Sequence, residues 1–143
     1  MEENKLAYLA GIIDGEGCIT INIHRIKGEM NGLLCRLIIN NTNEHLINFC
    51  KNAFIELGVD EKRIKMYTRG GGIYKNTKRK KCWIIMINQM SSILIILSQI
   101  EKFLLVKKEQ AKLIIEYIKN MDTYSNKMEL YERMKILNDW RLE

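Results

Sequence analysis

Two carboxylates, Asp14 and Glu16, alternate with glycines at the end of the segment LAGIIDGEG, which spans residues 9–17. Carboxylates are oxygen ligands that hard divalent ions accept. Glycine allows the backbone to turn sharply, which leaves a neighbouring carboxylate exposed. The pattern therefore predicts an exposed acidic group at the end of a helix. Taken alone, it also fits an ordinary amphipathic helix with an acidic, glycine-rich end.

The residues before the acidic turn predict the helix that positions it. Apolar side chains recur with the helical period over residues 5–13, and residues 14–17 are expected to end the helix. Ala10 and Gly11 leave one face of this helix almost without side chains, so that another helix can approach very closely. This small face predicts a partner helix.

Beyond the turn, strand and helix patterns alternate to the end of the chain. The two-residue period of hairpin strands covers residues 19–24 and 33–40, and further strands are expected over 63–69 and 80–87. Asn43 is a candidate N-cap for a helix that ends at Gly58, and helices are also expected from residue 91, over 106–121 and over 125–140. The order is α-β-β-α-β-β-α with carboxy-terminal helices, which is an α+β fold in a single domain, residues 1–143.

The composition indicates a polyanionic partner. Lys and Arg outnumber Asp and Glu by 23 to 17, which gives a net charge of +6. The amino terminus, MEENKLAY, lacks the regions of a secretory signal, and no apolar run reaches the roughly 20 residues that span a bilayer. We therefore expect a soluble, intracellular protein with no membrane partner, in an organelle or a bacterial cytoplasm.

The cysteines do not suggest a metal site. Cys18, Cys35, Cys50 and Cys82 lie far apart, without a Cys-x-x-Cys pair, and the chain has two histidines. This spacing disfavours zinc and favours reduced, mostly buried thiols.

The segment LAGIIDGEG resembles the signature of the LAGLIDADG homing endonucleases, and the order of helices and strands resembles this family over most of the chain. In that family a four-stranded antiparallel sheet forms a saddle on DNA, so the resemblance implies the same fold here. Glu16 stands where the signature has its second Asp, with the same charge and one more methylene. The resemblance implies that Glu16 and the backbone carbonyl of Gly15 bind Mg²⁺. It assigns Asp14 to the helix end and to the interface between two signature helices.

Two further segments resemble active-site regions of the family. FLLVKKEQA, residues 103–111, resembles the start of a late helix that bears a basic catalytic residue, here Lys107. INNTNEHL, residues 39–46, resembles a strand-to-helix junction that supplies a polar residue near the catalytic water. Asn41 is the first candidate for that role and His45 the second. The plainer interpretation makes them a solvated lysine and two capping or surface groups.

One chain contains one copy of the signature, whereas cutting both DNA strands needs two sets of acids. A twofold homodimer that packs the Ala10 and Gly11 faces together would supply both sets. The expected function is that of an intron-encoded homing endonuclease, or meganuclease, which makes a metal-dependent double-strand break in a long pseudo-palindromic site. Mn²⁺ is expected to replace Mg²⁺, Ca²⁺ to bind without supporting cleavage, and no small-molecule cofactor is expected. An intron RNA maturase and a nuclease-dead DNA-binding protein of the same fold are the alternatives.

The strand patterns also predict the surface that reads DNA. Because the apolar strand faces pack on helices, the opposite faces look outward, where Arg can recognise guanine and Asn adenine. The expected DNA-binding residues on the strands are Thr20, Asn22, His24, Arg36, Lys65, Tyr67 and Arg69. Toward the hairpin ends they are Arg25, Lys78, Arg79, Lys80 and Lys81. Strand length and twofold symmetry predict a site on the order of 20 base pairs.

Overall fold

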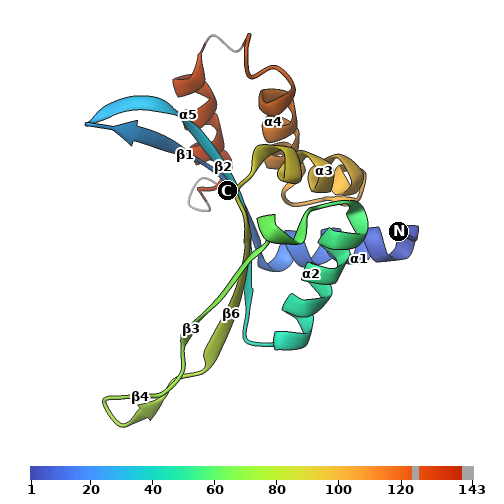
Figure 1. Ribbon diagram of the computed structural model, residues 1–143, viewed down its shortest axis with the longest axis vertical. Coiled ribbons are helices and arrows are strands. Elements are labelled where there is room, and N and C mark those ends of the chain that lie inside the picture. The colour runs from blue at the N-terminus through green and yellow to red at the C-terminus, as the bar shows by residue number, and fades with distance from the viewer. Residues whose placement is uncertain (124–125, 140–143) are drawn as a thin grey trace.

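Figure 1 shows the protein as a computed structural model, which describes residues 1–123 and 126–139. The predicted order of elements is confirmed. The main elements are α1 (Glu3–Glu16), β1 (Gly17–Ile26), β2 (Glu29–Asn41), α2 (Glu44–Leu57), β3 (Lys65–Gly70), β6 (Lys81–Ile87), α3 (Met90–Ile100), α4 (Lys108–Lys119) and α5 (Lys127–Leu137). Residues 125 and 140, the predicted ends of the last helix, lie outside the described residues. Of the helices that are described, none is both long and apolar enough to cross a membrane.

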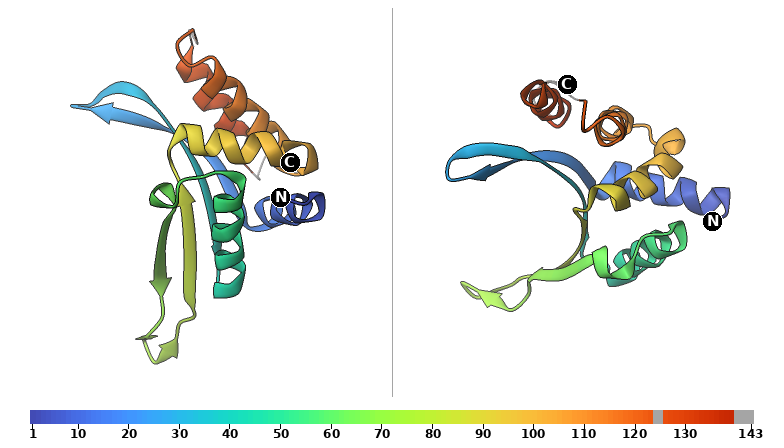
Figure 2. Two further views of the ribbon diagram at one scale, coloured as in Figure 1. Left: turned by 45° about the vertical axis from the view of Figure 1, so that its right-hand side comes forward. Right: turned by 45° about the horizontal axis from the view of Figure 1, so that its top comes forward.

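The four long strands form one antiparallel sheet in the order β1-β2-β6-β3. The sheet is curved, and the described helices lie on its convex side and along the β1–β2 hairpin, away from its concave side (Figure 2). The β1–β2 and β3–β6 hairpins extend from the sheet in different directions (Figure 1). This arrangement confirms the predicted four-stranded saddle.

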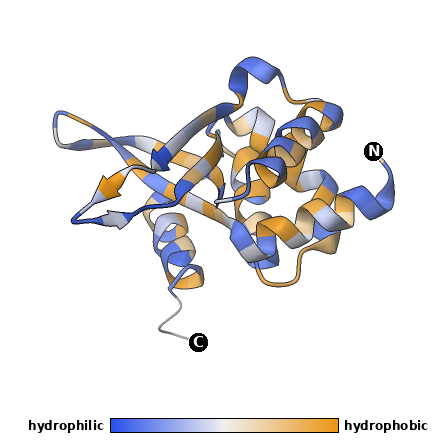
Figure 3. Ribbon diagram, turned by 90° about the horizontal axis from the view of Figure 1, so that it is seen from below, coloured by the Kyte–Doolittle hydropathy of each residue, from blue (hydrophilic) through white to orange (hydrophobic). Residues whose placement is uncertain are grey.

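The core lies between the convex side of the sheet and the helices. Ile19 of β1 and Leu37 and Ile39 of β2 are at most 1% exposed, and they belong to one apolar cluster with Leu9 and Ile13 of α1. Figure 3 shows the hydrophobic residues concentrated in this layer. Burying each such side chain stabilises the fold by about 1.5 to 3 kcal/mol, so the two-residue period dictates which strand face turns inward.

The first helix ends within the predicted segment, residues 14–17. The helix α1 includes Asp14, Gly15 and Glu16, and its C-cap is Gly17. A Cβ at Gly17 would lie 2.7 Å from the carbonyl oxygen of Ile13, so only glycine allows the chain to leave the helix so closely. Asp14 and Glu16 therefore sit on the last helical turn rather than in a loop.

The second hairpin is more elaborate than predicted. Residues 61–63 form a 3-10 turn (Glu61–Arg63), so β3 begins only at Lys65. At the tip, two short strands, β4 (Ile73–Tyr74) and β5 (Thr77–Lys78), pair around a turn in which Lys75 and Asn76 have φ values of 47° and 62°, respectively. Two positive φ values match a type I′ turn, which the glycine pattern at 70–72 did not predict.

Candidate functional site

The last turn of α1 is joined to the start of α4 through Asp14. Its carboxylate accepts hydrogen bonds from three successive backbone N–H groups, those of Leu105 (2.8 Å), Val106 (3.1 Å) and Lys107 (2.9 Å). The Lys107 ammonium donates in return to the backbone carbonyl of Asp14. Since α4 begins at Lys108, Asp14 satisfies donors that a helix start leaves without partners. The contacts join segments 91 to 93 residues apart.

Glu16 lies two residues beyond Asp14 on the same turn. Its side chain is exposed, and the ion pairs of the described residues do not include it. Gly15 is exposed beside it, and its carbonyl belongs to the end of the helix, where carbonyls lack an intrahelical donor. Both oxygens also lie at the negative end of the helix dipole. These two oxygen donors are of the kind that the predicted Mg²⁺ site requires.

Lys107 brings a positive charge to the same turn. Besides its bond to the carbonyl of Asp14, its ammonium lies near the thiol of Cys18, at the start of β1. Burial raises the pKa of the Cys18 thiol, and the Lys107 charge offsets part of that rise. The structure thus places the predicted basic residue next to the predicted acidic one.

Asn41 and His45 lie around the junction of β2 and α2. Gly17 pairs with Ile39, so Asn41 ends its strand close to the last turn of α1. The Asn41 Oδ1 accepts a hydrogen bond from the backbone N–H of Asn43 at 2.8 Å, and Asn43 caps α2 as predicted by accepting from His45 N–H at 2.9 Å. The oxygen of Asn41 therefore shapes this turn, and its NH₂ group is the part that can reach a substrate. The His45 ring is exposed on the first turn of α2.

One chain does not build a complete metal centre. In the part of the chain that the structure describes, no three His, Cys, Asp or Glu side chains lie close enough together to hold a metal ion. Asp14 is occupied with the start of α4, which leaves Glu16 as the exposed carboxylate of this turn. Further oxygen ligands would have to come from a second chain, from phosphate groups or from water.

The exposed face of α1 differs from the predicted one. Ala10 is fully buried within its own chain, so the prediction that it forms an exposed small face is wrong. Helical geometry turns Ala10 toward the core together with Leu9 and Ile13. Gly11 is exposed as predicted, and a Cβ built on it would meet no atom within 4 Å.

The small face that α1 does expose consists of Ala7, Gly11 and Gly15. These residues follow one another at intervals of four, which places them on one side of the helix, and all three are exposed. Gly15, like Gly11, has open space where a Cβ would be. Two exposed apolar residues, Leu105 and Val106, lie next to this end of α1, because their backbone N–H groups bond to the Asp14 carboxylate. Leu105 is 87% exposed and Val106 is 67% exposed.

The register of the sheet places the predicted reading residues on one face. Thr20 pairs with Arg36, and the β3 residues Lys65 and Tyr67 pair with residues of β6. Since side chains alternate along a strand, one set shares the concave face: Thr20, Asn22, His24, Arg36, Lys65, Tyr67 and Arg69. The ion pairs found among the described residues lie on the helical side, so none of them neutralises a cation of this face.

Arg36 has an additional feature that the sequence does not reveal. Its Nε is buried, yet it has no hydrogen-bond partner in the structure. Leaving a buried donor without a partner costs about 1 to 3 kcal/mol. The Arg36 side chain thus lies partly within the concave face, with a hydrogen-bonding group that no other described residue satisfies.

The two central strands carry residues that the predicted reading surface lacks. Ile38 of β2 and Ile84 and Met86 of β6 point to the concave face, in register with the polar residues of β1 and β3. Their outward position follows from strand pairing, and pairing between distant segments is not visible in the sequence. The concave face therefore has polar residues on its edge strands and an apolar group on its central strands, next to Arg36 and Asn40 of β2.

The tip of the second hairpin is strongly basic. Residues 65–87 contain seven Lys or Arg and no acidic residue. The Arg79 guanidinium lies 4.3 Å from the centre of the Tyr74 ring, while Lys78 and Lys80 are exposed and line a cleft of about 710 Å³ with Arg79 and Lys81. In the first hairpin, Arg25 is exposed and bonds through Nη1 to the carbonyl of Gly28 at 3.3 Å.

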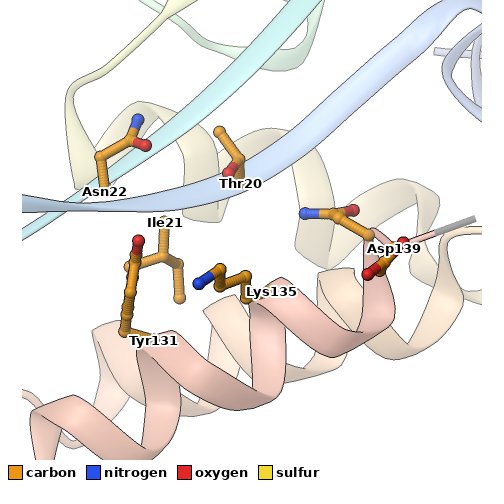
Figure 4. A pocket seen from close by; sticks show the side chains of 7 residues that line it. Thr20, Ile21, Asn22, Tyr131, Lys135 and Asp139 are labelled. Carbon is orange, nitrogen blue, oxygen red and sulfur yellow. The ribbon is translucent and has the colours of Figure 1, made fainter. Parts of the chain in front are cut away.

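A second cleft, of about 500 Å³, lies between β1 and α5 (Figure 4). Tyr131 and Lys135 of α5 line it opposite Thr20 and Asn22 of β1. The Asn138 side chain donates to the carbonyl of Ile19 at 3.0 Å, which ties the end of α5 to β1. In Figure 4, Ile21 points toward α5, whereas Thr20 and Asn22 point away from it. The carboxy-terminal helix thus places Lys135 beside β1, a position that no sequence motif indicated.

Comparison with known proteins agrees with the predicted fold. No family model and no curated protein matches the sequence. The solved homing endonuclease I-CvuI, in complex with its target in the presence of Ca, is 21% identical with a TM-score of 0.71, and the match covers 95% of this chain and 83% of that one. The archaeal intron-encoded homing endonuclease I-Vdi141I, complexed with DNA, is 15% identical with a TM-score of 0.71, over 98% and 87% of the two chains.

A longer protein matches as well. The LAGLIDADG homing endonuclease I-GzeII, in complex with its DNA target, is 19% identical with a TM-score of 0.58; the match covers 91% of this chain but 40% of that one. The chain described above therefore has the fold of the LAGLIDADG homing endonucleases, and it spans less than half the length of I-GzeII.

Proposed function

We propose that this chain is one subunit of a homodimeric, metal-dependent homing endonuclease that cuts both strands of a long, pseudo-palindromic DNA site. The position of Glu16 carries the proposal, because this exposed carboxylate directly precedes β1, where the concave face begins. Basic residues on that face fit a polyanion, and an acid at its margin fits hydrolysis of a phosphodiester. I-CvuI and I-Vdi141I, which are matched over most of their lengths, hold DNA in their solved structures.

The proposed dimer packs two α1 helices through Ala7, Gly11 and Gly15. Open space at both glycines permits close helix approach, and Leu105 and Val106 would be buried beside it. A twofold axis along this contact would bring the two Glu16 carboxylates together, and so supply ligands that the described part of one chain lacks. The 40% coverage of I-GzeII also fits, because a protein of that length has room for two such units.

The residues at the end of α1 fit a hard divalent ion, with Glu16 and the Gly15 carbonyl of each chain as oxygen ligands. Mg²⁺, when bound, would supply an activated water and stabilise the departing 3′ oxygen. Mn²⁺ accepts the same ligands, whereas Ca²⁺ is larger and holds them less strictly, so it should support binding without cleavage. We expect 5′ phosphate products.

The protein groups around these ligands have separate roles. The Lys107 ammonium would offset negative charge at the reacting phosphate. The NH₂ group of Asn41 would orient water, and His45 is the second candidate for that task. Asp14 would act as a positioning residue, since it holds Lys107 and the start of α4 against α1.

Sequence-selective recognition would come from the concave face. Arg36 and Arg69 are suited to guanine and Asn22 to adenine in the major groove. The hairpin residues Arg25, Lys78, Arg79 and Lys80, with Lys81, would bind phosphates, which position the protein without reading sequence.

Cleavage of a randomised DNA library in Mg²⁺ tests this proposal, with parallel reactions in Ca²⁺ and in EDTA. We expect recovery of one family of pseudo-palindromic sites on the order of 20 base pairs, cut only in Mg²⁺. Bound sites that are never cut would indicate a nuclease-dead DNA-binding protein. Promotion of intron splicing without any DNA cleavage would indicate an RNA maturase instead.

A further inference from the structure

The middle of the concave face carries an apolar patch, which we name the apolar centre and define as Cys18, Ile38, Ile84 and Met86. Cys18 pairs with Ile38 and Ile38 with Met86, so these three form one row across β1, β2 and β6. Ile84 lies one row further along on β6. It is 4% exposed and forms the floor, whereas Ile38 and Met86 are half-buried and Cys18 is exposed.

Polar groups surround the apolar centre. Met86 pairs with Lys65 and Ile84 with Tyr67 on one side, and Thr20 and Arg36 form the adjacent row on the other. Figure 2 shows that the described helices lie away from the concave side, so the patch is bordered by side chains of the sheet itself. An apolar patch enclosed by cations and hydrogen-bonding groups complements a polyanion that presents small apolar groups.

Duplex DNA presents one such group in its major groove, the C5-methyl of thymine. We propose that the apolar centre reads thymine methyl groups, so that each half-site carries at least one thymine in its innermost base pairs, the pairs nearest the cut. This inference rests on the proposed function, because it names the bases that the same surface recognises.

The position along the half-site follows from the chain. Cys18 comes two residues after Glu16, and its row is the first outward-facing row beyond the end of α1. In a dimer that meets along α1, this row lies closest to the twofold axis and to the proposed acids. Asn22 and His24 lie further out along the first hairpin, so hydrogen-bond readout belongs to the distal base pairs.

Replacing thymine by deoxyuridine tests the proposal on the DNA, since uracil lacks the methyl group but keeps every hydrogen-bonding group of thymine. Each thymine of the selected site is replaced in turn, and affinity is measured in Ca²⁺. We expect a loss of about fourfold for each innermost thymine, the effect of withdrawing one methyl group from an apolar contact. Thymines in the distal base pairs, including those paired with the adenines that Asn22 would recognise, serve as the matched control and should show no loss.

A protein variant locates the contact. Ile38→Val removes one methylene from the apolar centre and should reduce the deoxyuridine effect at the innermost positions. Ile115→Val makes the same change in a half-buried residue of α4 and should leave that effect unchanged. Thermal unfolding of both variants separates altered recognition from lost stability.

Several results would overturn this inference while leaving the proposed function standing. The inference is wrong if the selected sites have only G·C pairs at the innermost positions. It is also wrong if the cut sites keep their affinity when deoxyuridine replaces thymine at every position. Sedimentation could also show that two copies of the chain associate through the concave face and that DNA separates them. That result would mean that a second copy, and not a thymine methyl group, covers the patch. By contrast, the absence of any preferred or cleaved site would remove the proposed function itself.

Discussion

The end of α1 and the concave face of the sheet both present polar groups, but the protein holds them in different ways. At the end of α1, Asp14 accepts three hydrogen bonds and Lys107 is bonded to a backbone carbonyl. On the concave face, Arg36 has a buried Nε without a partner. The contrast teaches that the proposed catalytic groups are few and fixed by long-range bonds, whereas the proposed recognition groups are many and lie on an open face of the sheet.

Glu16→Gln should impair cleavage at the end of α1 without weakening DNA binding by the concave face. The amide keeps the size of the side chain but loses the charge that holds a cation, so cleavage should fall at least about a hundredfold. DNA affinity should persist or rise, because a negative charge near phosphates is removed. Cleavage and binding assays on the same site would measure both, and cleavage at the wild-type rate would eliminate Glu16 as a ligand.

Gly11→Leu should prevent the two subunits of the proposed dimer from packing through their α1 helices. A large side chain in the open space beside Gly11 would hold two α1 helices apart, and cleavage should be abolished. Sedimentation should then show monomers, with the fold retained. Ala10→Gly, at a buried position, should leave the association unchanged. A wild-type monomer on DNA would contradict the proposed interface.

Arg36→Ala and Arg69→Ala should weaken DNA binding by about 1 to 3 kcal/mol each, with relaxed preference at a few bases. Lys119→Ala, an exposed change on α4, provides the control. Binding to a panel of single-base variants of the site would reveal the pattern. An equal loss for all sequences would make these arginines phosphate contacts.

Asp14→Ala should lower the free energy of unfolding by about 2 kcal/mol, because the cap and charged hydrogen bonds at the start of α4 are lost. Denaturant unfolding would measure this change, with the exposed Glu132→Ala as control. Cleavage should also fall, since Lys107 loses its fixed position. Unchanged stability would show that these bonds matter little to the fold.

Lys80→Ala should have the smallest effect. A lost phosphate contact lowers affinity for all sequences alike and reduces the slope of log K against log salt by about 1. A salt titration of binding would measure the slope, and a change in base preference instead would move Lys80 into the reading surface.

Local pattern was sufficient for much of the fold and part of the site. The alternation of apolar residues along the strands identified the inward face of the sheet. Two separate motifs indicated Glu16 and Lys107, and the structure brings both residues to the last turn of α1. The same reasoning was correct for the end of α1 but wrong for the exposure of Ala10. That exposure depends on how the helix packs against the core, which a nine-residue pattern does not contain.

The sequence by itself determined the order of elements, the acidic helix end and the polar character of β1 and β3, because each follows from residue types within one or two turns or strands. Only the tertiary structure decided that Ile38 and Met86 share a face, that α1 exposes Ala7 with Gly11, and that Asp14 caps α4. These facts depend on the register between strands and on contacts between distant segments. Such contacts form only when the whole chain packs around one core.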